Sequence, residues 1–308
     1  MNGLGLPTAK DLGTRFSIVG FLPTLTAVLI VLAVVWSGAP SYPPSYHRAM
    51  RSANELNAGA WVTLGLIILV LVLVTHPLEL RLVRLLEGYP RGPLLRPVVR
   101  RLHNLQVKRW KALHCIVNND GRSPNERLAA AEALRYGFPP REDRVLPTRL
   151  GNVLRAAEDR AGEYYGWSTV AAWPRLYMLL PDQAASLVAD ARNQLDTACK
   201  FTISFALAGM IAFALLVSDG AWCLLALLIG VMSWLSYRGA IEAARSYGAV
   251  IQAVFDLYRL ELLRTMHLPL PHDAEEERRI SAAVSQWFSQ GLPHQLRYDF
   301  GGDDVKSC

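Results

Sequence analysis

The sequence predicts an all-α membrane protein with four transmembrane helices in two hairpins, and a cytoplasmic helical domain built on long extensions of the third and fourth spans. Three observations predict this fold class: four apolar runs without a charged residue, a strongly basic segment after the second run, and helical patterns that continue beyond the last two runs. Of the 308 residues, 52% are apolar, and the mean hydropathy is +0.19. Both values exceed those of an ordinary soluble protein.

The four apolar runs are long enough to cross the hydrocarbon core of a bilayer. They comprise Phe16–Trp36, Ala58–Thr75, Phe201–Val217 and Ala221–Tyr237. At about 1.5 Å per residue, helices of these lengths reach roughly 25–32 Å. The first run is longer than the apolar region of a signal peptide, which favours a retained span over a cleaved leader. Aromatic residues, which prefer the headgroup level, lie near the ends of the runs: Trp36, Trp61, Trp222, Trp234 and Tyr237.

A basic segment after the second run sets the predicted orientation. His76–Lys111 carries nine Lys and Arg residues against Glu79 and Glu87. Because basic loops remain on the cytoplasmic side, this segment and both termini are predicted to lie inside. Arg48 and Arg51, in the predicted outer loop, mildly oppose this orientation. The expected location is the plasma (inner) membrane, with both termini cytoplasmic.

This topology divides the chain into four parts. They are a first transmembrane hairpin (1–75), a cytoplasmic helical domain (76–199), a second transmembrane hairpin (200–237), and a cytoplasmic helical extension with a tail (238–308). The two hairpins echo each other, since Arg15-Phe16-Ser17-Ile18 resembles Lys200-Phe201-Thr202-Ile203 and Gly59-Ala60-Trp61 resembles Gly220-Ala221-Trp222. A parallel repeat is one explanation; the low complexity of apolar sequence is the other.

The nine basic residues are also candidates for binding anionic lipid headgroups at the inner leaflet. Each Lys or Arg near such a surface contributes about 1 kcal/mol of attraction. The simpler interpretation is a topology signal on a solvated face, because such residues flank most cytoplasmic loops. The candidates are Arg81, Arg84, Arg91, Arg96, Arg100, Arg101, Lys108, Arg109 and Lys111.

The polar centre of the chain is predicted to stand away from the bilayer. Apolar residues recur every three or four positions through Asp182–Lys200, and Arg238–Met266 continues the fourth run without a proline. A continuous helix of 19 residues lifts its first residue about 28 Å from the membrane. We therefore expect Trp167, Trp173 and Tyr177 to form the core of a cytoplasmic head.

Shorter helices are expected to complete this head. Ser123 and Glu126 have the spacing of a capping box, with Pro124 at the first helical position. Thr148–Tyr165 places apolar residues at helical spacing. Asp273–Gln290 begins with a capping aspartate and is followed by a glycine, which is typical of a helix.

Small residues recur at helical spacing along the last hairpin and beyond it. Such steps let helices approach closely in lipid, where packing drives association. They predict either packing within one chain, or a subunit interface and pore lining in a homo-oligomer. The residues are Ser204, Ala208, Ala212, Ala226, Gly230, Ala240, Ala244 and Gly248.

The sequence offers no motif for catalysis, for a cofactor or for a metal, and no signature of nucleic-acid binding. Glu158, Asp159 and Glu163 are acidic neighbours on one predicted helix, but the interspersed arginines favour charge pairing over metal ligation. Asp256 and Arg259 are expected to pair in the same way. The runs themselves lack charged residues, which argues against a coupled transporter and leaves a channel possible.

The stretch Pro147–Asp182 contains LGNVLRAAEDRAGEYYG followed by WPRLYMLLPD. Together with the hairpin that follows it, this stretch resembles an uncharacterised family of bacterial multi-pass integral membrane proteins. The resemblance covers about half of the chain. It implies a membrane location and carries no activity or functional residues to this sequence.

Two functions from different classes follow as hypotheses. The first is a non-enzymatic oligomeric channel or pore controlled by the cytoplasmic helical domain. The second is a membrane-anchored scaffold or signalling subunit that recruits a soluble partner to the inner face. The expected partners are the lipid bilayer with its anionic lipids, further copies of the chain and, in the second hypothesis, a soluble cytoplasmic protein.

Overall fold

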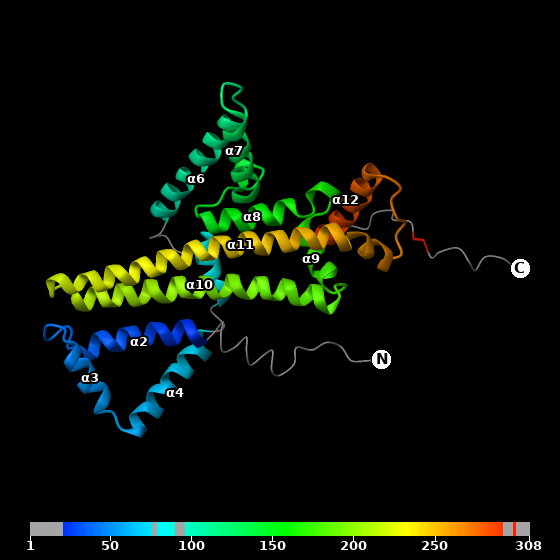
Figure 1. The fold of residues 1–308 in the computed structure, drawn as a ribbon. Coiled ribbons are helices and arrows are strands. Elements are labelled where there is room, and N and C mark those ends of the chain that lie inside the picture. Colours follow the sequence, from blue (N-terminus) through cyan, green and yellow to red (C-terminus); the bar gives the residue numbers. More distant parts are fainter. Residues whose placement is uncertain (1–20, 76–78, 90–95, 292–297, 300–308) are drawn as a thin grey trace, which may run out of the picture. The chain divides into compact units, whose positions relative to one another are not determined.

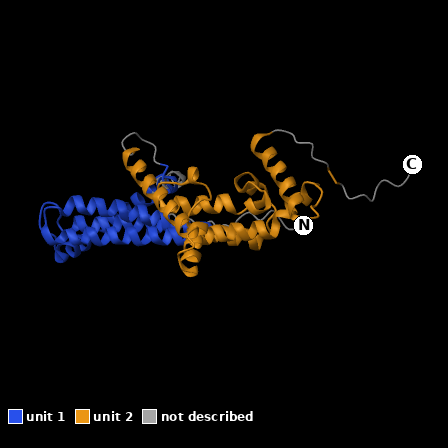
Figure 2. Cartoon of the chain, turned by 90° about the horizontal axis from the view of Figure 1, so that it is seen from above, with its two compact units in different colours: residues 1–90, 192–243 blue, residues 91–191, 244–308 orange. Residues whose placement is uncertain are grey.

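The structure, a computed structural model, describes residues 21–75, 79–89, 96–291 and 298–299. Within these ranges the chain forms α-helices, short 3-10 helices and turns, and contains no strand (Figure 1). The chain divides into two compact units (Figure 2). Unit 1 comprises residues 1–90 and 192–243, and unit 2 comprises residues 91–191 and 244–308.

Two helices are long and apolar enough to cross a membrane. They are α10 (Asp182–Leu216), and α11 (Cys223–Thr265) together with the short 3-10 helix η6 (Gly220–Trp222) that precedes it. Both helices run unbroken from an apolar run into polar sequence, as the pattern predicts, because no proline or glycine cap interrupts either one. Their length and composition indicate a membrane protein.

The remaining helices of unit 1 are shorter. They are α2 (Leu22–Trp36), α3 (Tyr46–Asn54), α4 (Ala58–Thr75) and α5 (Glu79–Glu87). The described part of the first apolar run is α2, whose 15 residues reach about 22 Å; residues 16–20 of that run lie outside the described residues. The second run forms α4 with the predicted bounds.

The predicted outer loop contains a helix that the sequence analysis missed. This helix, α3, is bent by 102° relative to the start of α4. Taken together, the two helices are long and apolar enough to form one broken span. Because α3 contains many polar residues, it forms no apolar run, and a search for apolar runs does not identify it. The first hairpin therefore differs from the second, which turns through the three-residue helix η6.

Unit 1 has its own apolar core. Val34 of α2 and Ala39 in the turn after it pack with Ala212 and Leu216 of α10 and Ile229 of α11. The two long helices also share a polar contact, because the hydroxyl of Ser233 donates to the carbonyl oxygen of Thr202 at 2.8 Å.

Aromatic packing joins two further helices of unit 1. The rings of Trp36, at the end of α2, and Trp61, in the first turn of α4, meet edge to face with centroids 6.1 Å apart. This edge-to-face contact ties the end of α2 to the beginning of α4.

Unit 2 combines shorter helices with the polar parts of α10 and α11. They are α6 (Arg96–Val117), α7 (Pro124–Gly137), η4 (Glu142–Arg144), α8 (Arg149–Arg160), η5 (Glu163–Tyr165), α9 (Thr169–Tyr177) and α12 (Ala274–Gln290). Helices α6 and α7 form a hairpin (Figure 1) in which Trp110 and Leu113 pack against Leu134 and Phe138.

Local sequence explains where these helices begin. Ser123 and Glu126 form the predicted capping box at the start of α7. The Thr148 hydroxyl accepts the Gly151 amide at the start of α8. The Asp273 carboxylate accepts two amide hydrogens at the start of α12. Each cap satisfies amides that the first helical turn leaves without a partner.

The main core of unit 2 contains one of the three aromatic residues that were predicted for it. Trp167 is buried. Trp173 is half-buried and stacks on the fully buried Phe255, with ring centroids 6.3 Å apart. For Tyr177 the prediction is wrong: it follows Trp173 by one helical turn and is 40% exposed, because α9 presents Ala172 and Leu176 to the core instead.

Candidate functional site

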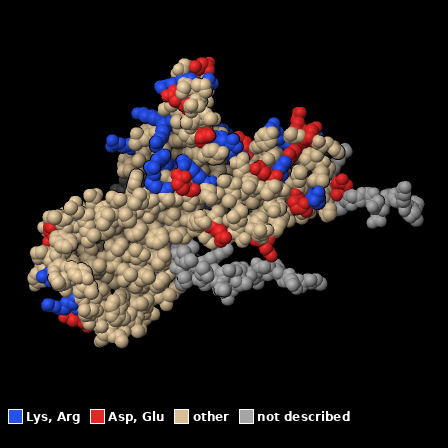
Figure 3. All heavy atoms as spheres, viewed as in Figure 1, with Lys and Arg blue, Asp and Glu red and all other residues tan. Residues whose placement is uncertain are grey.

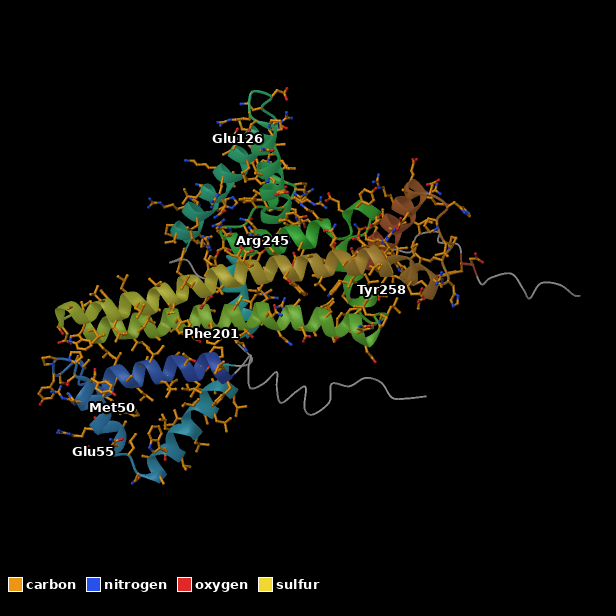
Figure 4. All side chains as sticks on the ribbon, in the orientation of Figure 1. Met50, Glu55, Glu126, Phe201, Arg245 and Tyr258 are labelled. Carbon is orange, nitrogen blue, oxygen red and sulfur yellow. The ribbon has the colours of Figure 1, made fainter. Side chains whose placement is uncertain are left out.

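A groove between α8 and α11 in unit 2 is large enough to receive a ligand. It has a volume of about 700 Å³, within the usual range of ligand sites. Its walls come from the end of α7, from α8, from the turn containing η5, and from the part of α11 that follows Ala244. Arg245 lies on this wall, where α11 passes α8 (Figure 4).

The floor of the groove consists of small side chains. They allow α8 and α11 to approach so closely that a Cβ added to Gly248 would lie 2.7 Å from the Cβ of Ala157. Alanine and glycine fill little space beside the contact, and both residues line the groove. The small residues that line it are Ala156, Ala157, Ala161, Ala244, Gly248, Ala249 and Ala253.

Arg160 is a half-buried cation of the groove. Its Nη2 donates to the carbonyl oxygens of Leu134 and Phe138, both at 3.4 Å, at the end of α7. Its Nε is buried and has no hydrogen-bond partner among the described residues. Burial lowers the pKa of Arg160, while Glu163 raises it and Arg135 lowers it further. A guanidinium remains charged in spite of such shifts, so the groove presents a partly buried positive charge.

Two further lining residues of the groove, Tyr165 and Asp256, belong to a polar network. The hydroxyl of Tyr165 donates to the Asp256 carboxylate at 2.8 Å, and the guanidinium of Arg259 lies 3.7 Å from the centre of the Tyr165 ring. Arg259 also donates to Glu277 of α12 at 2.6 Å. Both partners of this ion pair are largely buried, so the network fixes η5, α11 and α12 to one another.

The predicted pair of Asp256 with Arg259 takes a different form. Arg259 donates one hydrogen bond to the backbone carbonyl oxygen of Asp256 and another to the carboxylate of Glu277. The Asp256 carboxylate is engaged by Tyr165. The partners arrive from η5 and α12, which are distant in sequence, so helical spacing alone could not identify them.

Two of the three acidic residues that were predicted to pair with arginines on one helix do so, while Glu163 lies beyond the end of α8, in η5. Asp159 receives two hydrogen bonds from Arg144, the Nε one at 2.7 Å, and Glu158 lies 3.5 Å from Arg155. Glu163 lines the groove. Among the described residues no group of three or more His, Cys, Asp or Glu side chains could hold a metal ion.

The predicted headgroup-binding residues are divided between two helices. Arg84 lies exposed on α5; the side chain of Arg81 and the whole of Arg91 lie outside what the structure describes. The other six are exposed on α6 (Figure 3), where Lys111 pairs with Glu142 at 2.7 Å. Those six are Arg96, Arg100, Arg101, Lys108, Arg109 and Lys111.

Most of the small residues predicted for packing or pore lining face the interior of a single chain. Gly248 and Ser204 are half-buried, and Gly230 is exposed with open space where a Cβ would stand. Five are buried: Ala208, Ala212, Ala226, Ala240 and Ala244. The buried members are therefore already engaged in packing within one chain.

The groove residues Arg160 and Tyr165 were not singled out by the sequence. In the sequence, the arginines of α8 all resemble exposed residues that pair with neighbouring acids. Only the contacts with α7 and the position beside α11 distinguish Arg160 from the others. Comparison of the chain with protein-family models, with curated proteins and with solved structures finds no match.

Proposed function

We propose that this protein is a non-enzymatic membrane-anchored scaffold that holds a soluble partner at the inner face of the plasma membrane. The apolar runs anchor the chain, and unit 2 presents the groove between α8 and α11 to the cytoplasm. One observation carries the proposal: the groove combines a floor of small residues with a rim of arginine and tyrosine side chains.

The rim has the chemistry of a protein-binding surface. Arginine and tyrosine dominate the energetically important positions of protein interfaces. Arg135 and Tyr136 are exposed beside each other, with the guanidinium 5.5 Å from the ring centre. Arg160 is half-buried and lines the same groove, so its positive charge favours a partner segment that carries a carboxylate.

Photo-crosslinking from within the groove tests this proposal. A photoreactive residue at Ala249, an exposed member of the floor, should crosslink in cells to one soluble protein in near-stoichiometric yield. The matched control is Leu257, which is exposed on the same helix and does not line the groove. Ala249→Trp should fill the groove and reduce recovery of that partner at least tenfold after mild extraction, whereas Leu257→Trp should not.

The oligomeric channel remains the second candidate. Two observations favour it: Gly230 is open on α11, and only 11% of the apolar window of that helix is buried within the chain. Purified protein that passes ions in liposomes, without a crosslinked partner at Ala249, would replace the scaffold with the channel. Equal crosslinking from Ala249 and Leu257 would also refute the groove as the partner site.

A further inference from the structure

Helix α6 exposes an apolar stripe that the described residues of unit 2 leave uncovered. Val98, Leu102 and Leu105 are 54%, 41% and 54% exposed. Their spacing of four and three residues places them in line on one face of the helix. A single exposed leucine is ordinary, but three in line form a surface that water solvates poorly.

The stripe is separate from the face that α6 uses for folding. Val107, Trp110, Leu113 and Val117 pack against the core formed with α7. The Trp110 ring nitrogen also donates to the carbonyl oxygen of Pro139 at 3.2 Å. This second face holds the hairpin together, while the described residues of unit 2 leave Val98, Leu102 and Leu105 exposed.

Basic side chains border the stripe. Arg101 and Lys108, seven residues apart, follow one edge of it, and Arg109 continues its line one turn later. All three are exposed, and no ion pair joins them to any described residue. The helix itself contains no Asp or Glu. Figure 3 shows Lys and Arg side chains gathered on the surface over α6.

We propose that α6 lies in the surface of an anionic bilayer, with Val98, Leu102 and Leu105 among the upper acyl chains. Arg101, Lys108 and Arg109 then contact the lipid phosphates. A helix with an apolar stripe and a basic border is the usual form of an interfacial anchor. This inference is independent of the groove between α8 and α11.

The connection to the apolar helices selects a membrane over other anionic partners. Only 20 residues separate Thr75, the end of α4, from Arg96, and nine of them form α5. So short a tether holds α6 at high effective concentration near a bilayer. A nucleic acid would match the charge of α6 but would leave its apolar stripe in water, whereas a lipid surface satisfies both.

Fluorescence of a label on the stripe tests the inference in the full chain. Leu105→Cys is labelled with a polarity-sensitive dye after the four native cysteines are replaced by alanine, and the protein is reconstituted into vesicles. Phosphatidylcholine alone is compared with phosphatidylcholine containing phosphatidylglycerol. The matched control is Leu128→Cys on α7, which is 61% exposed. Only the label at position 105 should shift to the blue and be quenched several-fold more by spin-labelled lipid in the anionic vesicles.

Charge reversal supplies the second readout. Arg101→Glu with Lys108→Glu should abolish the lipid dependence, and concentrated salt should weaken it. Arg279→Glu on α12 is the matched exposed control. Hydrogen exchange of the unaltered chain in nanodiscs should show several-fold slower exchange of α6 with anionic lipid, which covers the case in which a variant fails to fold.

Three results would overturn the proposal. Identical spectra from positions 105 and 128 in every vesicle would show that the stripe remains in water. Equal hydrogen-exchange rates of α6 in nanodiscs with and without anionic lipid would lead to the same conclusion. A label at position 105 that becomes buried with soluble polyglutamate, but not with anionic vesicles, would assign the face to an acidic protein instead.

Discussion

Gly248 of α11 packs directly against Ala157 of α8, where a Cβ on Gly248 would lie 2.7 Å from that of Ala157. Real carbon atoms do not approach so closely, so the contact depends on the missing side chain. Gly230, eighteen residues earlier on the same helix, has open space in this direction. The two glycines belong to the same pattern of small residues, but Gly248 is in close contact with another helix and Gly230 is not.

This difference predicts opposite effects of the same substitution. Gly248→Leu should separate α8 from α11 and lower the free energy of unfolding by about 1–3 kcal/mol or more, as overpacked contacts do. Gly230→Leu should leave folding within about 0.5 kcal/mol of the original value, since the new side chain meets no protein atom. Thermal unfolding in detergent micelles measures both.

The oligomeric state of the two variants separates packing within a chain from packing between chains. Native mass spectrometry should show that Gly248→Leu changes stability without changing subunit number. A loss of subunits with Gly230→Leu would identify that glycine as an interface between copies. Unchanged stability of Gly248→Leu would contradict the close contact with Ala157.

The long helices were predictable because their signals are local. Asp182–Lys200 and Arg238–Met266 keep helical periodicity up to the apolar runs, and nothing between interrupts them. The caps at Ser123 and Asp273 are local too. By contrast, α3 was missed because its residues are mixed in polarity, so that a search for spans treats them as a loop.

The groove could not be predicted, because it depends on which distant helices meet. Gly248 and Ala157 are ordinary small residues in the sequence, and only their contact reveals a groove floor. Arg160 resembles the other arginines of α8 until the end of α7 provides its acceptors. Spacing along one helix identifies faces, but it does not say what each face will contact.

Trp173 and Phe255 form a second comparison. Phe255 is fully buried at the centre of the unit 2 core, while its stacking partner Trp173 is half-buried. Phe255→Ala should therefore cost about 3–5 kcal/mol of stability. Trp173→Ala should cost less, about 1.5–3 kcal/mol, because less of its surface leaves water on folding.

Chemical denaturation of the two alanine variants measures this order. A larger loss from Trp173→Ala than from Phe255→Ala would place the centre of the core at α9 instead of α11. Tyr177→Ala is the control, since its side chain is exposed and its removal should change stability by less than about 1 kcal/mol.

Tyr165 should make the stability of unit 2 sensitive to alkaline pH. Desolvation raises the pKa of Tyr165 above its ordinary value, and the hydrogen bond to Asp256 raises it further. The folded state therefore favours the protonated phenol. Its contribution to stability is complete below about pH 10, the pKa of an unfolded tyrosine, and is lost as pH rises through the higher folded pKa.

Stability measured from neutral to strongly alkaline pH should reveal this effect. Wild-type protein should lose stability more steeply above about pH 10 than Tyr165→Phe. Tyr164→Phe is the matched control, because Tyr164 is the exposed neighbour and is 66% accessible. Its alkaline profile should follow the wild type. Identical profiles for all three proteins would show that the phenol of Tyr165 titrates as it does in water.

The proposed orientation gives the last prediction. A cysteine at Arg122, in the exposed turn between α6 and α7, should lie in the cytoplasm, because the strongly basic segment before it favours the inner side of the membrane. An impermeant maleimide added to intact cells should not label Arg122→Cys and should label it after permeabilisation. Glu55→Cys, exposed after α3 (Figure 4), should be labelled in intact cells. The four native cysteines must be replaced by alanine in both variants. Labelling of position 122 from outside, with position 55 protected, would invert the topology and move the groove to the other side of the membrane, where a cytoplasmic partner could not reach it.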